Sequence, residues 1–551
     1  MKTQNKPGIL TGAIVGAMLT AVLIAVSFAA WRLAGLPFVA FDVFDWVTRI
    51  LPGRVIAFGI NSMVAAIRAL GVGPTAAVAK GVEQAMGIAG LFFTGIGGGA
   101  VLFGIVRWMR GRYAYPLSLV MGIVVGVPVT LISLSLSHTT SVTPAAAGLW
   151  ILAIFLLWGA AFGWAYRRLS PAGAPTAARS EPAPESQAYA ERVDRRRFLI
   201  RLGGAAAAIT VGGAMVGALS SGRRDKRAIS AAELRWSAAN ALPNAGAAVE
   251  PAPGTRAEYT PLEKHYRIDI NTIPPHIDGE QWRLKVGGLV DKPMELTLDE
   301  LRSREPMHQF ITLACISNPV GGDLIGTTRW TGVSLQRLLP ELGLKPDATH
   351  LKISAADGFY EVIPLEIIRS DERVMLAYAW DGVPLLTAHG FPLRVYIPDV
   401  YGMKQPKWIE SIEATDHWEP GYWVVRGWDE VARMKATSVI DTVAADATVA
   451  GAQGEVLVPI GGIAHAGARG ISKVELQVDG GPWQQAELRS PLSDLTWVLW
   501  RYNWPFQAGE HAFTVRCWDG AGTAQIVAPN PPEPNGASGL HSIRRRIRER
   551  A

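Results

Sequence analysis

Five long stretches without a charged side chain constrain the fold more than any other feature of this 551-residue sequence. Each contains 21 to 23 residues, and a helix of that length spans the roughly 30 Å hydrocarbon core of a membrane. Buried helices of a soluble protein would show charged faces and amphipathic periodicity, which these stretches lack. The sequence therefore predicts a membrane-embedded α-helical N-terminal region. Its spans are Gly8–Ala30, Gln84–Val106, Tyr115–Ser137, Ala145–Tyr166 and Leu202–Gly222.

Basic residues around these stretches predict their orientation, because cytoplasmic loops of membrane proteins are enriched in Lys and Arg. The flanks expected on the cytoplasmic side contain Lys2, Lys6, Arg107, Arg110, Arg112, Arg167 and Arg168. The fifth stretch is nearly balanced, since Arg195–Arg197 and Arg223–Arg224 lie on its opposite sides. We therefore expect a multi-pass protein of the cytoplasmic membrane whose five spans export everything after Gly222.

Three other features of the N-terminal half have their own signatures. The apolar run "VIAFGINSMVAAI" is too short to cross a membrane and predicts an interfacial helix. The segment "DRRRFLIRLGGAAAAITVGG" looks like a twin-arginine export signal placed inside the chain, and a stop-transfer flank of positive charges would have the same pattern. Residues 171–193 and 230–259 are linkers whose composition cannot build a core.

Changes in composition divide the chain into five predicted parts. A four-span region at 1–170 is followed by a cytoplasmic linker with the fifth span at 171–222 and a second linker at 223–259. At 260–432, "WRLKVGG" and "HLKISAA" predict half-buried strands and "TLDELRS" and "SLQRLLPEL" predict short helices, which is an α+β pattern. At 433–545, strands and turns alone, including the Asp-Gly hairpin "VELQVDGGPWQQAEL", predict an all-β sandwich of Ig-like size.

Several kinds of site are excluded by residue pattern. The sequence has no strand–Gly-rich loop–helix phosphate motif and no Cys-x-x-Cys or His-x-x-x-His zinc pair. His138 is the only histidine before His265, so the spans cannot supply two haem ligands, and two cysteines cannot hold an iron–sulfur cluster. A net charge of +6 without a basic stripe interleaved with aromatic residues predicts no nucleic-acid partner.

The two cysteines differ in their surroundings. Cys517 shares a strand face with Phe513 and Val515, and we expect it to be a core thiol. Cys315 instead ends the apolar run "FITLAC" before a loop rich in Gly, Asn and Thr. Farther along, "HGFPLRVYIPDVYGMKQPKW" gathers cations around a strand and a Gly-bearing turn, which together suit an anionic phosphate. Each Lys or Arg taken alone would more commonly be a solvated surface charge.

Residues 261–545 resemble the sulfite oxidase family of molybdopterin-dependent oxidoreductases in four ordered segments. "HYRIDINTIPPHIDGEQWRLKVGGLVDKPMELTLDEL" is similar to the start of the family's catalytic domain. "TLACISN" with "GGDLIGTTRWTGVSL" resembles its molybdenum–cysteine segment, and "HGFPLRVYIPDVYGMKQPKW" resembles its cofactor-binding segment. "VELQVDGGPWQQAEL" and "WVLWRYNW" resemble its Ig-like dimerisation domain.

This resemblance implies both a fold and a set of residue roles. The implied fold is a sulfite-oxidase-type molybdopterin domain followed by an Ig-like sandwich through which two chains would form a homodimer. Cys315 would be the catalytic residue, the thiolate ligand of a molybdenum carried by one molybdopterin. The residues expected to bind the cofactor are Arg267, Asn318, Asp357, His389, Arg394, Lys404 and Lys407.

The sequence departs from the family pattern where sulfite would bind. Family sulfite oxidases follow the ligand Cys with Gly-Asn and paired arginines, whereas this chain has Pro319 and Val320 after Asn318. Trp428 stands where a tyrosine is expected, and Val498 stands where the sandwich contributes an arginine. Because sulfite carries two negative charges, a site without these cations should bind it poorly. The resemblance still implies oxygen transfer at a sulfur centre, either sulfite or a less charged sulfoxide.

Two functions from different classes follow. The first is a membrane-anchored molybdenum oxidoreductase that acts on a small molecule outside the cytoplasmic membrane. Because the sequence predicts neither haem nor iron–sulfur ligands, its electrons would pass to or from a separate carrier, either a cytochrome c-like protein or a haem-bearing membrane subunit. The alternative is a non-catalytic membrane receptor or adhesion protein that retains the fold.

Overall fold

The computed structural model describes residues 6–109, 111, 113–136, 142–170, 184–224 and 242–549. Lys2, Arg110, Arg112, His138 and parts of both predicted linkers lie outside these residues. The chain forms two compact units, each made of residues that contact one another more than they contact the rest of the chain. The first unit comprises Met1–Leu51, Lys80–Ala228 and Asn271–His276, and the second comprises Pro52–Ala79, Ile229–Ile270 and Ile277–Ala551.

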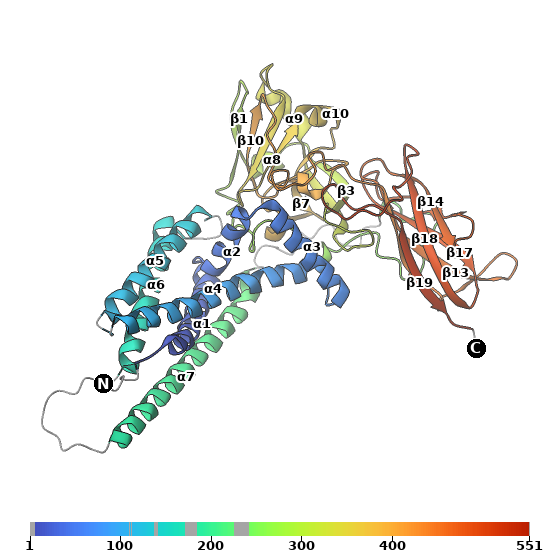
Figure 1. Ribbon diagram of the computed structural model, residues 1–551. Helices are drawn as coiled ribbons and strands as arrows, with labels where there is room; N and C mark the ends of the chain where they lie inside the picture. The colour runs from blue at the N-terminus through green and yellow to red at the C-terminus, as the bar shows by residue number, and fades with distance from the viewer. Residues whose placement is uncertain are drawn as a thin grey trace. The chain divides into compact units, whose positions relative to one another are not determined.

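The first unit is helical. Within it α1 packs along α7 and α5 packs along α6 (Figure 1). Its helices are α1 (Ile9–Ala34), α2 (Val39–Ile50), most of α4 (Thr75–Trp108), α5 (Ala114–Ser135), α6 (Pro144–Leu169) and α7 (Pro184–Arg224).

Small residues let these helices approach closely. A Cβ added at Gly159 of α6 would lie 2.5 Å from the Ser118 carbonyl oxygen of α5, and one added at Gly16 of α1 would collide with Gly95 of α4. Such glycine contacts are typical of helices that pack within a membrane.

Six helices in the described part of the chain are long and apolar enough to cross a membrane. Five correspond to the predicted spans, and within α7 the apolar window is Arg196–Val216. The sixth is α3 (Gly53–Leu70), which extends the 13-residue run predicted as an interfacial helix to 18 residues. This helix belongs to the second unit rather than to the helical one.

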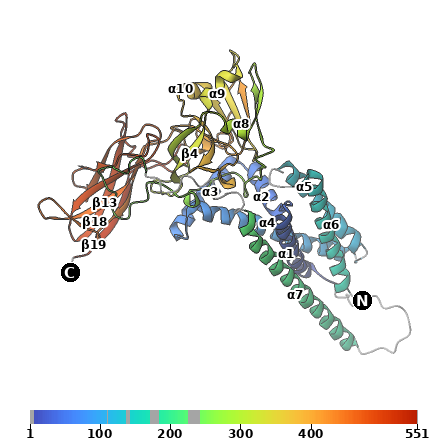
Figure 2. The same cartoon turned by 180° about the vertical axis from the view of Figure 1, so that it is seen from behind.

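The second unit contains the predicted α+β pattern, built on two sheets that share one hydrophobic core. The first sheet has the order β2-β1-β10-β5-β6, in which β1 runs parallel to β10. The second has the order β3-β4-β7-β8, with β9 beside β7. Figure 2 labels β4 of this sheet. The strands are β1 (Arg283–Gly288), β2 (Met294–Thr297), β3 (Met307–Ala314), β4 (Ile325–Ser334), β5 (His350–Ala355), β6 (Tyr360–Pro364), β7 (Met375–Trp380), β8 (Val383–Pro384), β9 (Arg394–Tyr396) and β10 (Ile409–Thr415).

Short helices connect these strands where the sequence predicts them. Thr297 and Glu300 form the reciprocal capping box that starts α8 (Leu298–Arg302). Ser334 precedes α9 (Leu335–Leu342), but its hydroxyl donates to the Glu372 carbonyl oxygen, 2.7 Å away, instead of capping the helix. The remaining helical elements are α10 (Leu365–Ser370), η2 (Leu262–Lys264), η3 (Thr387–His389) and η4 (Gly402–Lys404).

The C-terminal part has two mainly antiparallel sheets whose buried faces form one cluster. Their strands are β11 (Thr437–Val443), β12 (Val449–Ala450), β13 (Val456–His465), β16 (Glu487–Leu488) and β17 (Val498–Pro505) in one sheet, and β14 (Ile471–Val478), β15 (Gln484–Gln485), β18 (Gly509–Asp519) and β19 (His541–Ile547) in the other. The predicted hairpin joins β14 to β15 through Asp479 and Gly480, both with positive φ. Cys517 is fully buried in the cluster, which confirms the predicted core thiol.

Candidate functional site

Cys315 directly follows β3 and starts a loop that is braced on the backbone. Its N–H donates to the Leu324 carbonyl oxygen (3.0 Å), and its own carbonyl oxygen accepts from the Asn318 N–H (3.0 Å). The Asn318 side-chain oxygen in turn accepts from the Leu324 N–H, 3.0 Å away. These bonds hold the two arms of the loop together, so the thiol has a fixed direction.

The Cys315 side chain is only 8% exposed, and its sulfur lies 2.9 Å from the Ser317 hydroxyl. Burial raises the pKa of this thiol, while the hydrogen bonds to Ser317 and the charge of Lys407 oppose the rise. A buried thiol of raised pKa is a weak nucleophile by itself, whereas a metal ion deprotonates a coordinating thiol outright. The surroundings of Cys315 therefore suit a metal ligand better than a free nucleophile.

Three predicted cofactor-binding residues come together along η3, β9 and the segment after η4. One Arg394 guanidinium nitrogen donates to the His389 carbonyl oxygen (3.0 Å), and the group lies 4.6 Å from the centre of the Trp330 ring. Lys407 Nζ donates to the Ile268 carbonyl oxygen (3.0 Å) and pairs with Asp269 (3.3 Å).

The segment His265–Asp269 completes this group, and sequence reasoning identified only Arg267 within it. Arg267 pairs with Asp269 at 2.6 Å, and the His265 ring lies 4.8 Å from Trp380 and 5.7 Å from His389. The segment is irregular, so it carries no strand or helix periodicity. The only available signal was its position, immediately before Arg267 in the first family-like segment.

The predicted residues thus divide into two sets. Arg267, Asp357, His389, Arg394 and Lys407 lie close enough to influence one another electrostatically. Burial lowers the pKa of Lys407, and the carboxylates of Asp269 and Asp357 oppose that shift while Arg267 and Arg394 add to it.

Lys404 and Asn318 are engaged elsewhere. Lys404 forms a buried ion pair with Glu361 at 3.0 Å, and Asn318 braces the Cys315 loop.

Buried hydrogen-bonding atoms allow a test of whether a molybdopterin fits here. The N–H groups of three neighbouring side chains are buried without a partner among the described residues: Trp330 Nε1, Trp380 Nε1 and Arg394 Nε. Buried polar atoms are normally satisfied, so a group rich in acceptors is expected to meet them. A pterin with its phosphate is such a group, and Arg267, Arg394 and Lys407 supply charge for it. The residues present fit the cofactor.

The two histidines of this site are neutral. Burial lowers the pKa of His265 to about 4, and it lowers the pKa of His389 well below its ordinary value, with the charges of neighbouring cations adding to both shifts. No cluster of three or more His, Cys, Asp or Glu side chains suited to a metal occurs in the part of the chain that is described.

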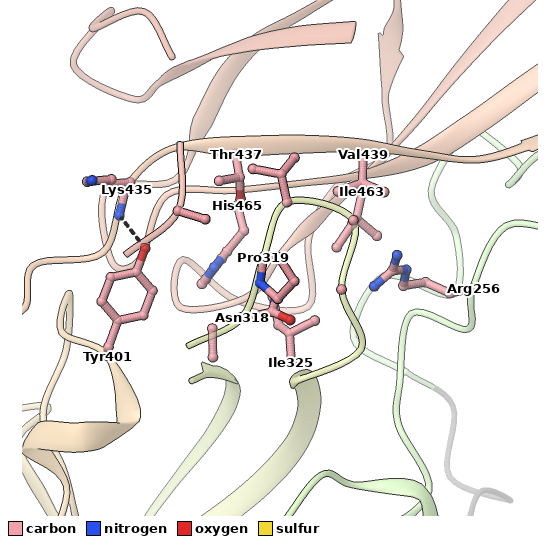
Figure 3. Close-up of a pocket in the computed structure, with 15 residues that line it drawn as sticks. Arg256, Asn318, Pro319, Ile325, Tyr401, Lys435, Thr437, Val439, Ile463 and His465 are labelled. Atoms are coloured by element: carbon pink, nitrogen blue, oxygen red, sulfur yellow. Dashed lines mark hydrogen bonds between the residues drawn. The ribbon is translucent and has the colours of Figure 1, made fainter. Parts of the chain in front are cut away.

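Residues of the Cys315 loop also line a small pocket together with residues of β11 and β13 (Figure 3). Its cations are engaged: Arg256 forms a bidentate pair with Asp441 (2.6 to 2.9 Å), and Lys435 Nζ contacts Asn535 Oδ1 at 2.7 Å. Tyr401 accepts a hydrogen bond from the Lys435 backbone N–H (3.2 Å; Figure 3). Burial, followed by the charge of Arg469, lowers the pKa of His465 to about 3, so this ring is neutral.

The four residues that depart from the family pattern are also placed. Pro319 and Val320 line this pocket. Trp428 is buried in a cluster with Ala314 and Ile316, and Val498 is buried at the start of β17.

Comparison with known proteins identifies the family of the region that contains this site. Residues 271–423 match the family model described as "Oxidoreductase molybdopterin binding domain". The uncharacterized oxidoreductase YuiH of Bacillus subtilis (strain 168) is 31% identical over 161 residues, which are 29% of this chain and 79% of that protein. Mitochondrial sulfite oxidase of Homo sapiens is 29% identical over 291 residues, covering 45% of this chain and 53% of that protein.

A third relative is the putative protein-methionine-sulfoxide reductase subunit YedZ1 of Azospira oryzae, which is 30% identical over 153 residues, 28% of this chain and 56% of that protein. The chain therefore spans about half the length of the sulfite oxidases and of YedZ1, but most of YuiH. The family model covers Cys315, and the match to YuiH extends over 79% of that protein, so this chain belongs to the sulfite oxidase family of molybdopterin oxidoreductases.

Proposed function

We propose that this protein is a membrane-anchored molybdenum oxidoreductase that transfers an oxygen atom at an uncharged sulfur centre, such as a sulfoxide, outside the cytoplasmic membrane. The observation that carries the proposal is the buried Cys315 thiol beside a donor-rich group whose buried nitrogens have no partner among the described residues. Molybdenum bound there would supply two-electron oxygen transfer.

Each part of the group has a proposed role. Cys315 holds the metal, and its braced loop fixes the direction of the sulfur. Arg267, Arg394 and Lys407 balance the negative charge of the cofactor, while the neutral His265 and His389 rings donate hydrogen bonds or accept them without adding charge. Asp357, whose carboxylate accepts from the Phe359 N–H (3.0 Å), shapes the turn that faces Lys407. Lys404 and Asn318 support the site through Glu361 and the Cys315 loop.

The charge of the pocket beside the loop favours a neutral substrate. Arg256 and Lys435 are both held by protein oxygens, and His465 is neutral. Moving a doubly charged anion from water into such surroundings costs free energy that no available cation returns. A sulfoxide needs no such compensation. In the reductive direction, it would take two electrons and two protons and give a thioether and water.

The contacts of the chain also support five membrane spans rather than six. Asp45 accepts from the Thr272 N–H (2.9 and 3.1 Å) within the helical unit, and Asp323 accepts from the Thr75 N–H (2.7 Å) within the second unit. Residues in contact lie on the same side of a membrane. Four crossings, by α4, α5, α6 and α7, separate Thr75 from Asp323 and satisfy this condition. A further crossing by α3 would put Asp45 and Thr272 on opposite sides, so we propose that α3 stays at the interface.

The remaining features complete the proposal. We propose the domain boundaries given above, with an Ig-like dimerisation fold for the C-terminal sheets. The basic segment that resembles a twin-arginine signal lies in α7, which continues without a break into the fifth span. Electrons would travel through a separate haem protein, so the purified chain should turn over only with that partner or with a redox dye.

Metal analysis of the purified chain tests the proposal most directly. We expect molybdenum near one atom per chain, and reduction of dimethyl sulfoxide by a reduced viologen dye at least tenfold faster than oxidation of sulfite under matched conditions. Molybdenum with the opposite preference would retain the enzyme and reject the neutral substrate. A folded chain without molybdenum would contradict the enzyme and favour the receptor alternative.

A further inference from the structure

We propose that the turn Gly71–Ala79, from the N-terminal region, forms one wall of the space at the Cys315 sulfur and selects the substrate by size. The turn joins α3 to α4 and belongs to the same compact unit as Cys315. This inference rests on the proposed role of Cys315 and adds a specificity-determining residue, Ala76, and a positioning residue, Asp323.

Local chemistry explains why the chain turns at this place. Gly71 has a φ of +60° and its N–H donates to the Ile67 carbonyl oxygen (3.0 Å), which is a left-handed glycine cap on α3. Gly73 has a φ of +135°, which side chains larger than hydrogen rarely adopt. Pro74 then precedes the first residue of α4, Thr75. The reversal is therefore specified by glycines and a proline within a few residues.

The first turn of α4 is buried by protein on one side. Thr75 is 3% exposed, Ala76 is 6% exposed and Ala79 is 3% exposed, whereas Ala77 faces outward. No charged side chain occurs between Gly71 and Ala79. The covered surface therefore consists of small, uncharged side chains.

Asp323 anchors this turn to the Cys315 loop. Its carboxylate accepts a hydrogen bond from the Thr75 backbone N–H at 2.7 Å. The first N–H groups of a helix have no partner inside the helix, and the positive end of the helix dipole attracts a carboxylate, so this contact is favourable on both counts. Asp323 and Thr75 are 248 positions apart, and only the tertiary fold brings them together.

Leu324 connects Asp323 to Cys315. Leu324, next to Asp323, accepts the Cys315 N–H through its carbonyl oxygen and donates its own N–H to Asn318. Ala76, Leu324 and Cys315 form one buried cluster, against which Tyr266 and Ile268 pack. The wall made by Thr75 and Ala76 therefore lies at the proposed metal ligand and beside the segment that contacts Lys407.

A wall of small side chains sets the room for the groups attached to the substrate sulfur. Ala76→Leu adds three carbon atoms at the wall, which a close-packed site cannot absorb without loss. We expect at least a tenfold larger fall in kcat/KM for methyl phenyl sulfoxide than for dimethyl sulfoxide. Ala77→Leu, on the exposed side of the same turn, is the matched control and should change neither value by more than about twofold.

A second measurement does not depend on turnover or on bound molybdenum. In the full chain with Cys517→Ser, Cys315 is the only thiol, and its alkylation by iodoacetamide can be followed in protein made without molybdopterin synthesis. Asp323→Asn weakens the anchor and should raise the alkylation rate about tenfold, because a hydrogen bond to a charged group is replaced by a neutral one. Asp347→Asn, an exposed position on another loop, is the control and should leave the rate unchanged.

The two measurements separate this inference from the proposed function. The inference is wrong if Ala76→Leu and Ala77→Leu have the same ratio of kcat/KM values for the two sulfoxides, and if Asp323→Asn and Asp347→Asn have the same alkylation rate at Cys315. If the chain holds no molybdenum but the alkylation differences appear, the proposed function fails and the wall stands. Should Ala76→Leu fail to fold, Ala76→Val provides the same comparison with a smaller side chain.

Discussion

The two cysteines show how the position of a residue decides what a thiol does. Cys517 lies in the apolar cluster between two sheets, where burial raises the pKa of its thiol to about 12. Cys315 is also buried, but it lies at the end of a strand beside Lys407 and a group of unpartnered donors. The same side chain is inert packing in one place and a candidate ligand in the other.

The first prediction follows from this difference. Cys315→Ser should leave the chain folded, abolish turnover and alter the molybdenum signal in electron paramagnetic resonance, because a serine hydroxyl is a harder and far less acidic donor. Cys517→Ser is the control, and it should lower the melting temperature without changing that signal. Full turnover by Cys315→Ser with a redox dye would show that the ligand assignment is wrong.

The second prediction concerns the cations of the cofactor group. Lys407→Met keeps the length of the side chain but removes its charge, and a charge-assisted contact contributes ~1.5–3 kcal/mol. We expect molybdenum occupancy to fall about tenfold or more while turnover per bound molybdenum stays within about twofold. Arg369→Met, exposed on α10, serves as the control. Normal occupancy with lost turnover would instead place Lys407 on the substrate side.

At the level of elements, strand β13 ends in a buried histidine that lines the same pocket as the Cys315 loop. His465 ends this strand, is 3% exposed and is neutral because burial lowers the pKa of its ring to about 3. Its Nε2 has no partner among the residues described. A histidine of lowered pKa binds fewer protons in the folded state than in the unfolded state, so folding stability falls as the pH decreases below about 6.5.

The third prediction gives this effect a size. Between pH 6.5 and pH 5, one such histidine can remove at most about 2 kcal/mol from the free energy of unfolding. His465→Gln should therefore show a smaller drop in melting temperature from pH 7 to pH 5 than the unmodified chain does. The exposed His417→Gln variant should keep the full drop. Equal slopes for all three proteins would show that His465 is protonated in the fold at these pH values.

At the level of the whole molecule, each compact unit is assembled from separate stretches of the sequence. The helical unit includes Asn271–His276, which lie at the start of the matched molybdopterin domain. The second unit includes Pro52–Ala79 from between the first two spans. Each unit therefore consists of three separate stretches of the sequence, and neither can be cut out by a single break.

The fourth prediction tests the proposed membrane topology, which the contacts of Asp45 with Thr272 and of Thr75 with Asp323 support. In spheroplasts of a Cys517→Ser strain, a single cysteine introduced at exposed Gly71 or Asp347 should react with a membrane-impermeant maleimide. One introduced at exposed Arg201, on the cytoplasmic flank of the fifth span, should react only after the membrane is opened. Protection of Gly71 together with labelling at Arg201 would mean either that α3 crosses the membrane or that the orientation is reversed.

Sequence patterns predicted the parts of this protein that depend on near neighbours. Length and lack of charge identified α1, α4, α5, α6 and α7 as candidate spans, and period-two alternation identified β1, β5 and the hairpin of β14. The same alternation placed Cys517 in the core. These properties follow from the backbone geometry of a helix or a strand, so a window of about ten to twenty residues contains all the necessary information.

The candidate site depended on contacts that no such window contains. Lys407 meets Asp269 across 138 positions, and His265 reaches Trp380 from an irregular segment without periodicity. Lys404 lies in the segment predicted to bind the cofactor, but its side chain pairs with the buried Glu361 instead. The free energy of closing a loop rises only slowly with its length, so chain separation hardly constrains which distant segments meet. Packing in the folded chain made that choice, and it placed Thr75, the first residue of α4, on Asp323 in the loop that Cys315 starts.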